Sequence, residues 1–229
     1  MKTILRRAKR VREKKAVYEA DTADIIIMEG IRLDEAEECL RSLRAKAVKV
    51  SQALKDADIP HAVIGGLAVL AHVARVNKAL IRNTRDLDIL INRSDLNRTA
   101  QALKSFGFSY RKVMGIPAFV LPRKVGSITS RFAEGVHIVW ADERVRPTDL
   151  IPAPSLLSQS IAFGPDGYAC LDIENLLKMK LTSFRLKDQV HIQDLMNVGL
   201  ITQKVKNSLP PELKARLKEV EEKTKQEKL

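Results

Sequence analysis

The stretch RNTRDLDILI, residues 82–91, decides the fold that this sequence predicts. Acidic and aliphatic residues alternate along it, which is typical of a β-strand with one face packed on a core. Asp86 and Asp88 share one face of such a strand, and the aliphatic residues share the other. Neighbouring carboxylates repel unless a cation lies between them. Mg²⁺ suits that place because it takes one or two carboxylates together with phosphate oxygens. Two acids on a solvent-facing strand are the plainer interpretation of the pair taken alone.

Upstream of this stretch, the sequence predicts a short apolar strand, then Gly65 and Gly66, then a helix. Glycines at such a junction let a phosphate approach the backbone and the amino terminus of the helix. A tight turn that needs a positive φ is the alternative explanation. His61 in the strand and His72 in the helix are expected to be structural residues.

The order of the remaining elements predicts an α+β fold, with a small mixed β-sheet flanked by helices and a C-terminal helical lobe. Further strands are expected within residues 108–125 and 135–140, and one helical region from Asp172 to Val198. The predicted organisation is a basic N-terminal arm (1–30), an α+β core (31–146), a Pro- and Gly-rich connector (147–167) and the helical lobe (168–229).

Positive charge dominates the 229-residue chain, since 40 Lys and Arg oppose 28 Asp and Glu and give a formal net charge of +12. Residues 1–15 hold eight bases and one acid. Such a block predicts a solvated arm that contacts RNA or another polyanion. With only Cys39 and Cys170, a disulfide framework and a cysteine zinc site are excluded. No apolar run approaches the ~20 residues of a membrane span, so we expect no membrane association and a cytoplasmic protein.

In combination these motifs resemble the nucleotidyltransferase superfamily, which has the fold of DNA polymerase beta. The anchors are IGGLA (residues 64–68) and TRDLDIL (residues 84–90), with looser matches in LKMK (residues 177–180) and RLKD (residues 185–188). The resemblance covers roughly residues 45–200 and is greatest to the bacterial minimal nucleotidyltransferases and the AbiEii toxin group. It implies a magnesium-dependent enzyme that moves a nucleoside monophosphate from an NTP to a hydroxyl of RNA or protein, with a possible antitoxin partner.

The resemblance also implies a role for individual residues. Asp86 and Asp88 would bind Mg²⁺ and serve catalysis, because two metals orient the hydroxyl and help pyrophosphate to leave. The implied nucleotide-binding residues are Gly65, Gly66, Thr84, Lys180, Arg185 and Lys187.

Lys180, Lys187 and Asp194 lie seven residues apart, so one unbroken helix would place them nearly in line. The alternative is that these lysines only cover a half-buried helix face.

His137 departs from the family pattern, because a third carboxylate is expected on the strand at residues 135–140. A neutral imidazole is a poor ligand for Mg²⁺. Glu134 or Asp142 could supply the acid, or His137 could act as the base that deprotonates the hydroxyl. In a third explanation the protein has lost catalysis and still binds nucleotide or RNA. His137 as an inert strand residue is the plainest interpretation.

Overall fold

A computed structural model describes residues 35–80, 82, 84–113, 115–122, 135–157, 161–163 and 167–226, with no side chains for 161–163. The chain separates into two compact units, Met1–Ser42 and Leu43–Leu229. Of the first, only residues 35–42 are described, and they are helical. The predicted basic arm therefore lies outside the described residues. In the second unit the helix continues to residue 56.

A seven-stranded mixed sheet forms the centre of this unit, with the strand order β3-β4-β5-β2-β1-β7-β6. Strand β2 runs antiparallel to β1 and parallel to β5, so it lies between two partners. The parallel pair β1–β7 then extends the sheet on the other side. The strands are β1 His61–Ile64, β2 Leu87–Ile91, β3 Ser109–Val113, β4 Ile116–Val120, β5 Val136–Trp140, β6 Ile161–Phe163 and β7 Ala169–Leu171.

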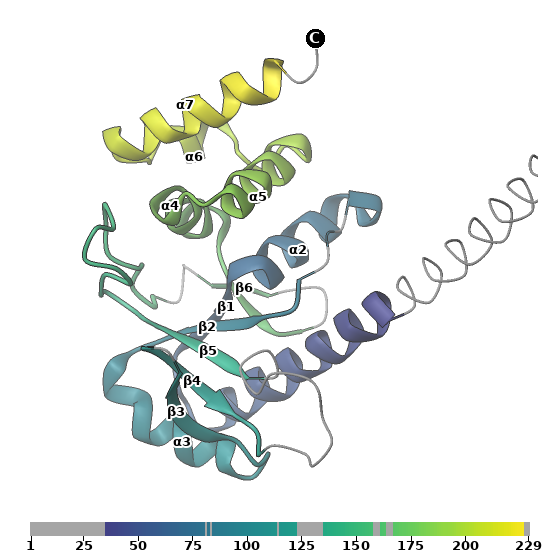
Figure 1. Cartoon of the computed structure of the whole chain (residues 1–229), viewed down its shortest axis with the longest axis vertical. Coiled ribbons are helices and arrows are strands. Elements are labelled where there is room, and N and C mark those ends of the chain that lie inside the picture. Colours follow the sequence, from purple (N-terminus) through teal and green to yellow (C-terminus); the bar gives the residue numbers. More distant parts are fainter. Residues whose placement is uncertain are drawn as a thin grey trace, which may run out of the picture. The chain divides into compact units, whose positions relative to one another are not determined.

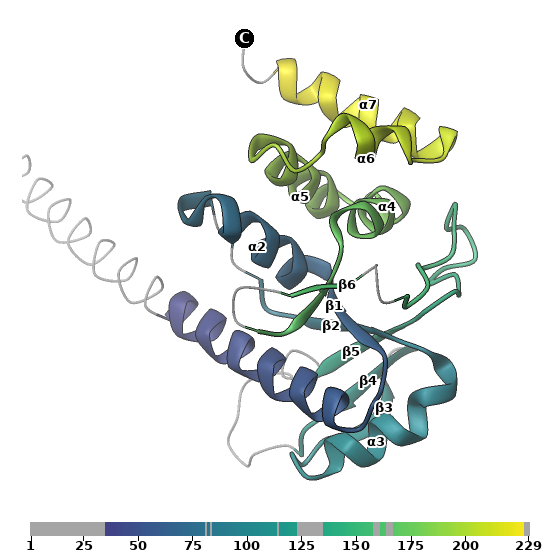
Figure 2. The ribbon, with the colours of Figure 1, turned by 180° about the vertical axis from the view of Figure 1, so that it is seen from behind.

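Helices cover the sheet, which confirms the predicted α+β class (Figure 1). Helix α2 packs on β1, β2 and β7 and on α4 and α5, and α7 packs on both α4 and α5. Viewed from behind, the helix over residues 43–56 crosses in front of the sheet (Figure 2). The labelled helices are α2 Gly65–Val76, η1 Lys78–Leu80, η2 Arg93–Asp95, α3 Leu96–Lys104, α4 Ile173–Ser183, α5 Leu186–Asn197, α6 Gln203–Asn207 and α7 Pro211–Gln226. None of the described helices is long and apolar enough to cross a membrane.

The prediction of one helical region from Asp172 to Val198 was wrong at its centre. Asp172 does cap the start of α4, where its side chain accepts a hydrogen bond from the Asn175 amide. However, α4 ends at Ser183, and the φ of the next residue, Phe184, is left-handed at +48°. A new helix, α5, begins two residues after Phe184, so Lys180 and Lys187 do not share one helix. At this turn the Asp188 carboxylate accepts hydrogen bonds from the Arg185 amide at 3.3 Å and from Arg185 Nε at 2.7 Å, which fixes the start of α5.

The connector and the lobe both contribute to the sheet. Strand β6 lies within residues 147–167, which the sequence predicts to be a connector, and β7 opens the predicted helical lobe. Because β7 pairs with β1, the two segments complete the core sheet.

Two buried histidines join the helices to the sheet, as predicted. The His72 Nε2–H donates to the Leu171 carbonyl oxygen at 2.8 Å and so ties α2 to β7. The His61 Nδ1–H donates to the Ile59 carbonyl, which leaves Nε2 to accept from the Ser51 hydroxyl at 2.6 Å. Burial lowers the pKa of both imidazoles, so both are neutral at pH 7.

Candidate active site

The first part of the site is the pair of acids at the start of β2. Leu87 and Ile89 are fully buried, whereas Asp86 and Asp88 are only partly covered and line one cavity. This is the alternation that the sequence predicts. It fades further along the strand, where Leu90 and Ile91 are both buried because both faces of the sheet are covered there.

Gly65 lies directly against the Asp88 carboxylate. In the antiparallel register of β1 and β2, Ile64 lies opposite Asp88, and Gly65 follows as the first residue of α2. A Cβ at Gly65 would stand 2.2 Å from Asp88 Oδ2, and the φ of Gly65 is +73°. Only glycine meets both conditions without strain. Glycine is thus required at position 65 both by the left-handed backbone conformation and by the closeness of the Asp88 carboxylate.

Gly66 makes a similar close approach to Thr84, because a Cβ there would stand 2.7 Å from Thr84 Oγ1. The first turn of α2 carries no acidic residue, and Ile64 at its N-cap offers no side-chain hydrogen bond. The first N–H groups of a helix lack partners within the helix, and they attract anions. The glycine pair therefore sets an uncapped helix terminus beside the acids.

His137 is the third member of the acidic corner. It lies opposite Asp88 in the parallel pairing of β2 and β5, and it is 8% exposed. Its Nδ1 contacts Asp88 Oδ1 at 3.1 Å. Asp142, one candidate for the missing acid, follows the far end of β5 and accepts a hydrogen bond from Ser155. It does not line the cavity. Glu134, the other candidate, lies outside the described residues.

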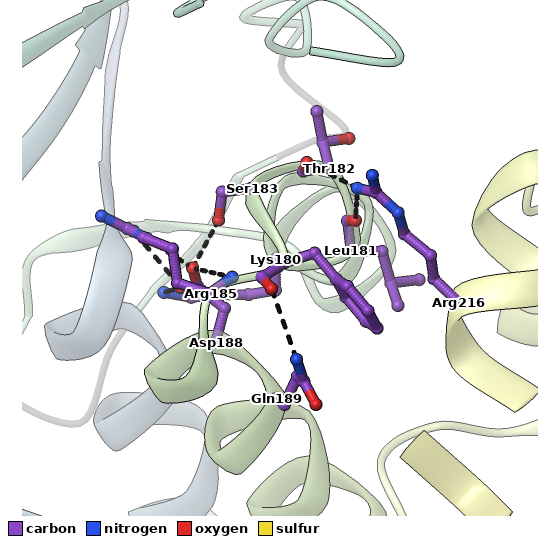
Figure 3. Close-up of polar contacts among 9 residues, drawn as sticks. Lys180, Leu181, Thr182, Ser183, Arg185, Asp188, Gln189 and Arg216 are labelled. Atoms are coloured by element: carbon purple, nitrogen blue, oxygen red, sulfur yellow. Dashed lines mark hydrogen bonds and ion pairs between the residues drawn. The ribbon is translucent and has the colours of Figure 1, made fainter. Parts of the chain in front are cut away.

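Across the cavity, the turn between α4 and α5 holds a cluster of charged side chains (Figure 3). Asp188 is fully buried and accepts from Lys180 Nζ at 3.0 Å, from Arg185 Nε at 2.7 Å and from Ser183 Oγ at 2.5 Å. Burial alone would raise the pKa of Asp188, but the hydrogen bonds and positive charges hold it well below its usual range. Asp188 is therefore ionised at neutral pH, where it orders Lys180 and Arg185.

Lys180 is itself 5% exposed and lines the cavity together with the acids of β2. Burial lowers the pKa of Lys180, whereas the charges of Asp188 and Asp88 oppose that shift. Lys187 is exposed at the same cavity, on the first turn of α5. The broken helix therefore brings both lysines to one cavity, although the predicted single line does not exist. Asp194, the third residue of that line, instead pairs with Arg82 at 2.8 Å.

A cavity of about 430 Å³ joins these elements. Seven of the residues predicted from the sequence line it, namely Gly65, Asp86, Asp88, His137, Lys180, Arg185 and Lys187. Gly66 and Thr84 pack against each other beside it without belonging to its lining.

Sequence reasoning missed the wall of this cavity that follows β5. Residues 145–153 contribute apolar side chains there, along with Arg146 and the buried Asp149. Asp149 Oδ2 accepts a hydrogen bond from the Arg146 amide. The only sequence signal for this wall was a stretch of prolines, which indicates a loop and says nothing of where the loop lies. The role of Asp188 as the organiser of the lysine cluster was also missed.

The acidic pair has the donor chemistry that Mg²⁺ requires, with two carboxylates on one face and space for a polyphosphate. Among the described residues, no group of three or more His, Cys, Asp or Glu side chains is placed to hold a metal ion. The residues present thus fit an ion whose remaining ligands come from a substrate and water.

No protein-family model matches the chain, and no curated protein matches it in sequence. Among solved structures, the crystal structure of ANT(2″)-Ia in complex with adenylyl-2″-tobramycin is similar, with a TM-score of 0.49 and 14% identity over 78% of this chain and 98% of that one. The solution structure of antibiotic-resistance factor ANT(2″)-Ia has a TM-score of 0.39 and 12% sequence identity, over 79% of this chain and 83% of that one. The crystal structure of the Megavirus polyadenylate synthase has a TM-score of 0.35 and 10% sequence identity, over 75% of this chain and 34% of that one. At these values the similarities carry no argument about activity, which has to come from the site.

Proposed function

We propose that this chain is a magnesium-dependent nucleotidyltransferase that moves a nucleoside monophosphate from an NTP to a hydroxyl of RNA or protein. The observation that carries the proposal is the contact of Gly65 with the Asp88 carboxylate. That contact puts the Asp88 carboxylate directly beside an uncapped helix terminus, which suits a phosphate. Asp86 lines the same cavity, and the two acids together suit a divalent cation. Lys180 and Lys187 add positive charge to the same cavity.

In the proposed reaction, the acceptor hydroxyl oxygen attacks the α-phosphorus of the NTP. A new P–O bond forms, the bond to the oxygen that bridges the α- and β-phosphates breaks, and pyrophosphate leaves with both electrons of that bond. The hydroxyl proton passes to a base, and His137 at the acidic corner is the candidate that the sequence indicates. Lys180, Arg185 and Lys187 hold the charged phosphates in place.

Asp86 and Asp88 are the residues that would hold Mg²⁺, which when bound would stabilise negative charge on the transferred phosphoryl group. His137 positions Asp88 through the contact of Nδ1 with Oδ1. A carboxylate that contacts the His137 ring on one side and has Gly65 close on the other has little room to move, which favours ligand binding.

The charge of the cavity favours a neutral or anionic acceptor. Its lining holds four bases and three acids, and two of those acids are assigned to the metal. A polycationic acceptor would thus find little to pair with. Basic residues 1–15 and the net charge of +12 support RNA, which a basic arm binds through its phosphates. Kinship with the AbiEii toxin group and an antitoxin partner remain predictions from the sequence resemblance.

A second candidate function is a nucleotide- or RNA-binding module without turnover. His137 favours it specifically, because an imidazole lies directly opposite Asp88 where the family pattern places an acid. The module would keep the helix terminus and the lysines, which are enough for phosphate binding.

One assay separates the two functions: incubation of the full chain with labelled NTPs, Mg²⁺ and either total RNA or lysate protein. The enzyme predicts transfer of label that disappears in Asp86→Ala and Asp88→Ala and persists in Glu222→Gln. Glu222 is a suitable control because it is an exposed acid on α7. Nucleotide binding without label on any acceptor would support the module, and a chain that binds neither nucleotide nor metal would refute both.

A further inference from the structure

Arg216 is a residue of α7 whose side chain reaches the turn between α4 and α5 (Figure 3). Its Nη1 donates to the carbonyl oxygens of Leu181 and Thr182, each at 2.7 Å. Its guanidinium carbon also stands 5.0 Å from the centre of the Phe184 ring. The described lining of the cavity does not include Arg216 itself. One side chain that lies outside the cavity thus contacts three of the four residues 181–184.

The two hydrogen bonds of Arg216 complete the carboxyl end of α4. The last four carbonyl groups of a helix have no partner within that helix. The carbonyl of Lys180 accepts from the Phe184 amide at 3.0 Å, and the next two carbonyls along the chain are the ones that Arg216 binds. A positive side chain at this end of a helix also complements the helix dipole. Arg216 therefore caps α4 from a separate helix, 35 residues beyond Leu181.

The peptide groups that Arg216 holds lie between residues of the cavity. Lys180 precedes Leu181 and Ser183 follows Thr182, and both Lys180 and Ser183 line the cavity. The same two side chains donate to the buried Asp188 carboxylate, which orders the cluster. Because the backbone is continuous, a shift of the two capped carbonyls would move Lys180 and Ser183 with them.

A second set of contacts ties α7 to the same turn. Lys223 Nζ donates to Gln189 Oε1 at 3.2 Å, and Gln189 Nε2 donates to the Phe184 carbonyl at 3.4 Å. Helix α7 also packs on both α4 and α5. The left-handed Phe184 is therefore contacted from α7 directly by Arg216 and, through Gln189, by Lys223.

We infer that Arg216 is a positioning residue for nucleotide binding, which fixes the α4–α5 turn so that Lys180 and Arg185 meet the phosphates of the nucleotide. This inference rests on the proposed function for the role of those two cations. They would hold the phosphates before and during the reaction alike. Displacing them should therefore raise the KM for NTP and leave kcat nearly unchanged.

The test compares Arg216→Met with Lys214→Met, which changes an exposed lysine of the same helix. Both variants remove one positive charge from α7, but only the first removes the cap. Binding of inorganic tripolyphosphate, of a non-hydrolysable NTP analogue and of the matching NMP is measured by calorimetry with Mg²⁺. The measurements use a temperature at which the melting curves show every variant folded.

Arg216→Met should bind tripolyphosphate and the NTP analogue about tenfold more weakly, which corresponds to the loss of one hydrogen bond to a charged group. Its affinity for NMP should stay within about twofold, because a single phosphate beside the acids depends less on the cations of the turn. The KM for NTP should rise about tenfold while kcat stays within about threefold. Lys214→Met should behave like the parent. Arg216→Lys, which keeps a charged donor for the two carbonyls, should recover most of the lost affinity.

Full affinity for tripolyphosphate in folded Arg216→Met would overturn the inference. Equal weakening for NMP and tripolyphosphate would do so too, because it indicates a general structural role. Should Arg216→Met fail to fold, Arg216→Gln takes its place. Its shorter, uncharged side chain cannot hold both carbonyls, so weaker binding of tripolyphosphate is expected and full affinity would again count against the inference.

The same measurements separate this inference from the proposed function. A parent that binds tripolyphosphate, with weaker binding in Arg216→Met, but transfers no label would support the inference and defeat the enzyme. Transfer of label by the parent with an unchanged KM for NTP in Arg216→Met would do the reverse. A parent that binds neither tripolyphosphate nor the NTP analogue would remove both.

Discussion

Replacing Gly65 by alanine tests the contact on which the site depends. The new Cβ would stand 2.2 Å from Asp88 Oδ2, at a backbone φ of +73°. The left-handed conformation alone costs about 1–2 kcal/mol for a residue with a Cβ. Relieving the overlap adds about 1–3 kcal/mol, as overpacking of a close-packed site usually does. The free energy of unfolding should therefore fall by about 2–5 kcal/mol.

Gly199→Ala is a matched control, because Gly199 has the same φ of +73° and nothing within 4 Å of its added Cβ. It should cost only the conformational part, about 1–2 kcal/mol. Urea denaturation of both variants measures the difference directly. Combining Gly65→Ala with Asp88→Ala should recover the steric part of the loss, which a double-mutant cycle would report as coupling.

Catalysis should suffer more than stability in Gly65→Ala. The carboxylate oxygen of Asp88 must retreat by about 1 Å to reach ordinary contact, and a misplacement of that size can cost about a hundredfold in rate. Transfer of label should fall by that factor in Gly65→Ala and stay near the parent level in Gly199→Ala. Equal stability losses in the two variants, or full activity in Gly65→Ala, would refute the reasoning.

Three further predictions follow from the charges. Asp88→Asn should abolish Mg²⁺-dependent nucleotide binding without unfolding the chain, and unchanged affinity in the presence of Mg²⁺ would defeat the metal assignment. Asp188→Asn should destabilise the chain by about 3–5 kcal/mol at pH 7, because it leaves Lys180 buried without its counter-charge. Since the folded pKa of Asp188 is depressed, its stabilisation is complete above the unfolded pKa of about 3.9 and is lost as pH falls through the folded value. The difference in the free energy of unfolding between parent and variant, measured by urea denaturation, should thus shrink from pH 7 to pH 3. A constant difference would argue against a stabilising ion pair between Asp188 and Lys180. Deleting residues 1–15 should weaken RNA binding and flatten its salt dependence with no change in melting temperature, and a lowered melting temperature would show that the arm supports the core.

The fold and the acidic corner could be predicted because short-range patterns encode them. The alternation around Asp86 and Asp88 identifies a strand, and the glycine pair identifies a strand-to-helix junction. The register that places Ile64 opposite Asp88 then follows from the pairing of neighbouring strands. The alternation and the glycine pair each depend on residues close together in the chain, whereas His137 reaches Asp88 from a strand 49 residues further on.

The rest depends on backbone events that sequence periodicity does not reveal. The left-handed Phe184 ends α4 although the apolar pattern continues, so the single helix drawn through Lys180 and Lys187 was wrong. The proline-rich stretch after the acids conceals the strand β6 and a cavity wall, because loop residues carry no periodic signal of what they pack against. Single residues such as Asp188 acquire their role only once two helix ends meet.

The central place of β2 in the sheet means that changes in this strand and changes in the loop at residues 145–153 have different consequences. A strand hydrogen-bonded on both sides exchanges its amide protons only in the rarest openings of the structure. Asp88, which we propose to bind the metal, thus lies in the part of the fold that we expect to open least often. The wall at residues 145–153 lies outside the strands and can be exchanged without disturbing β2. A lineage of such proteins could therefore acquire new acceptors by loop replacement alone while its phosphate chemistry stayed constant.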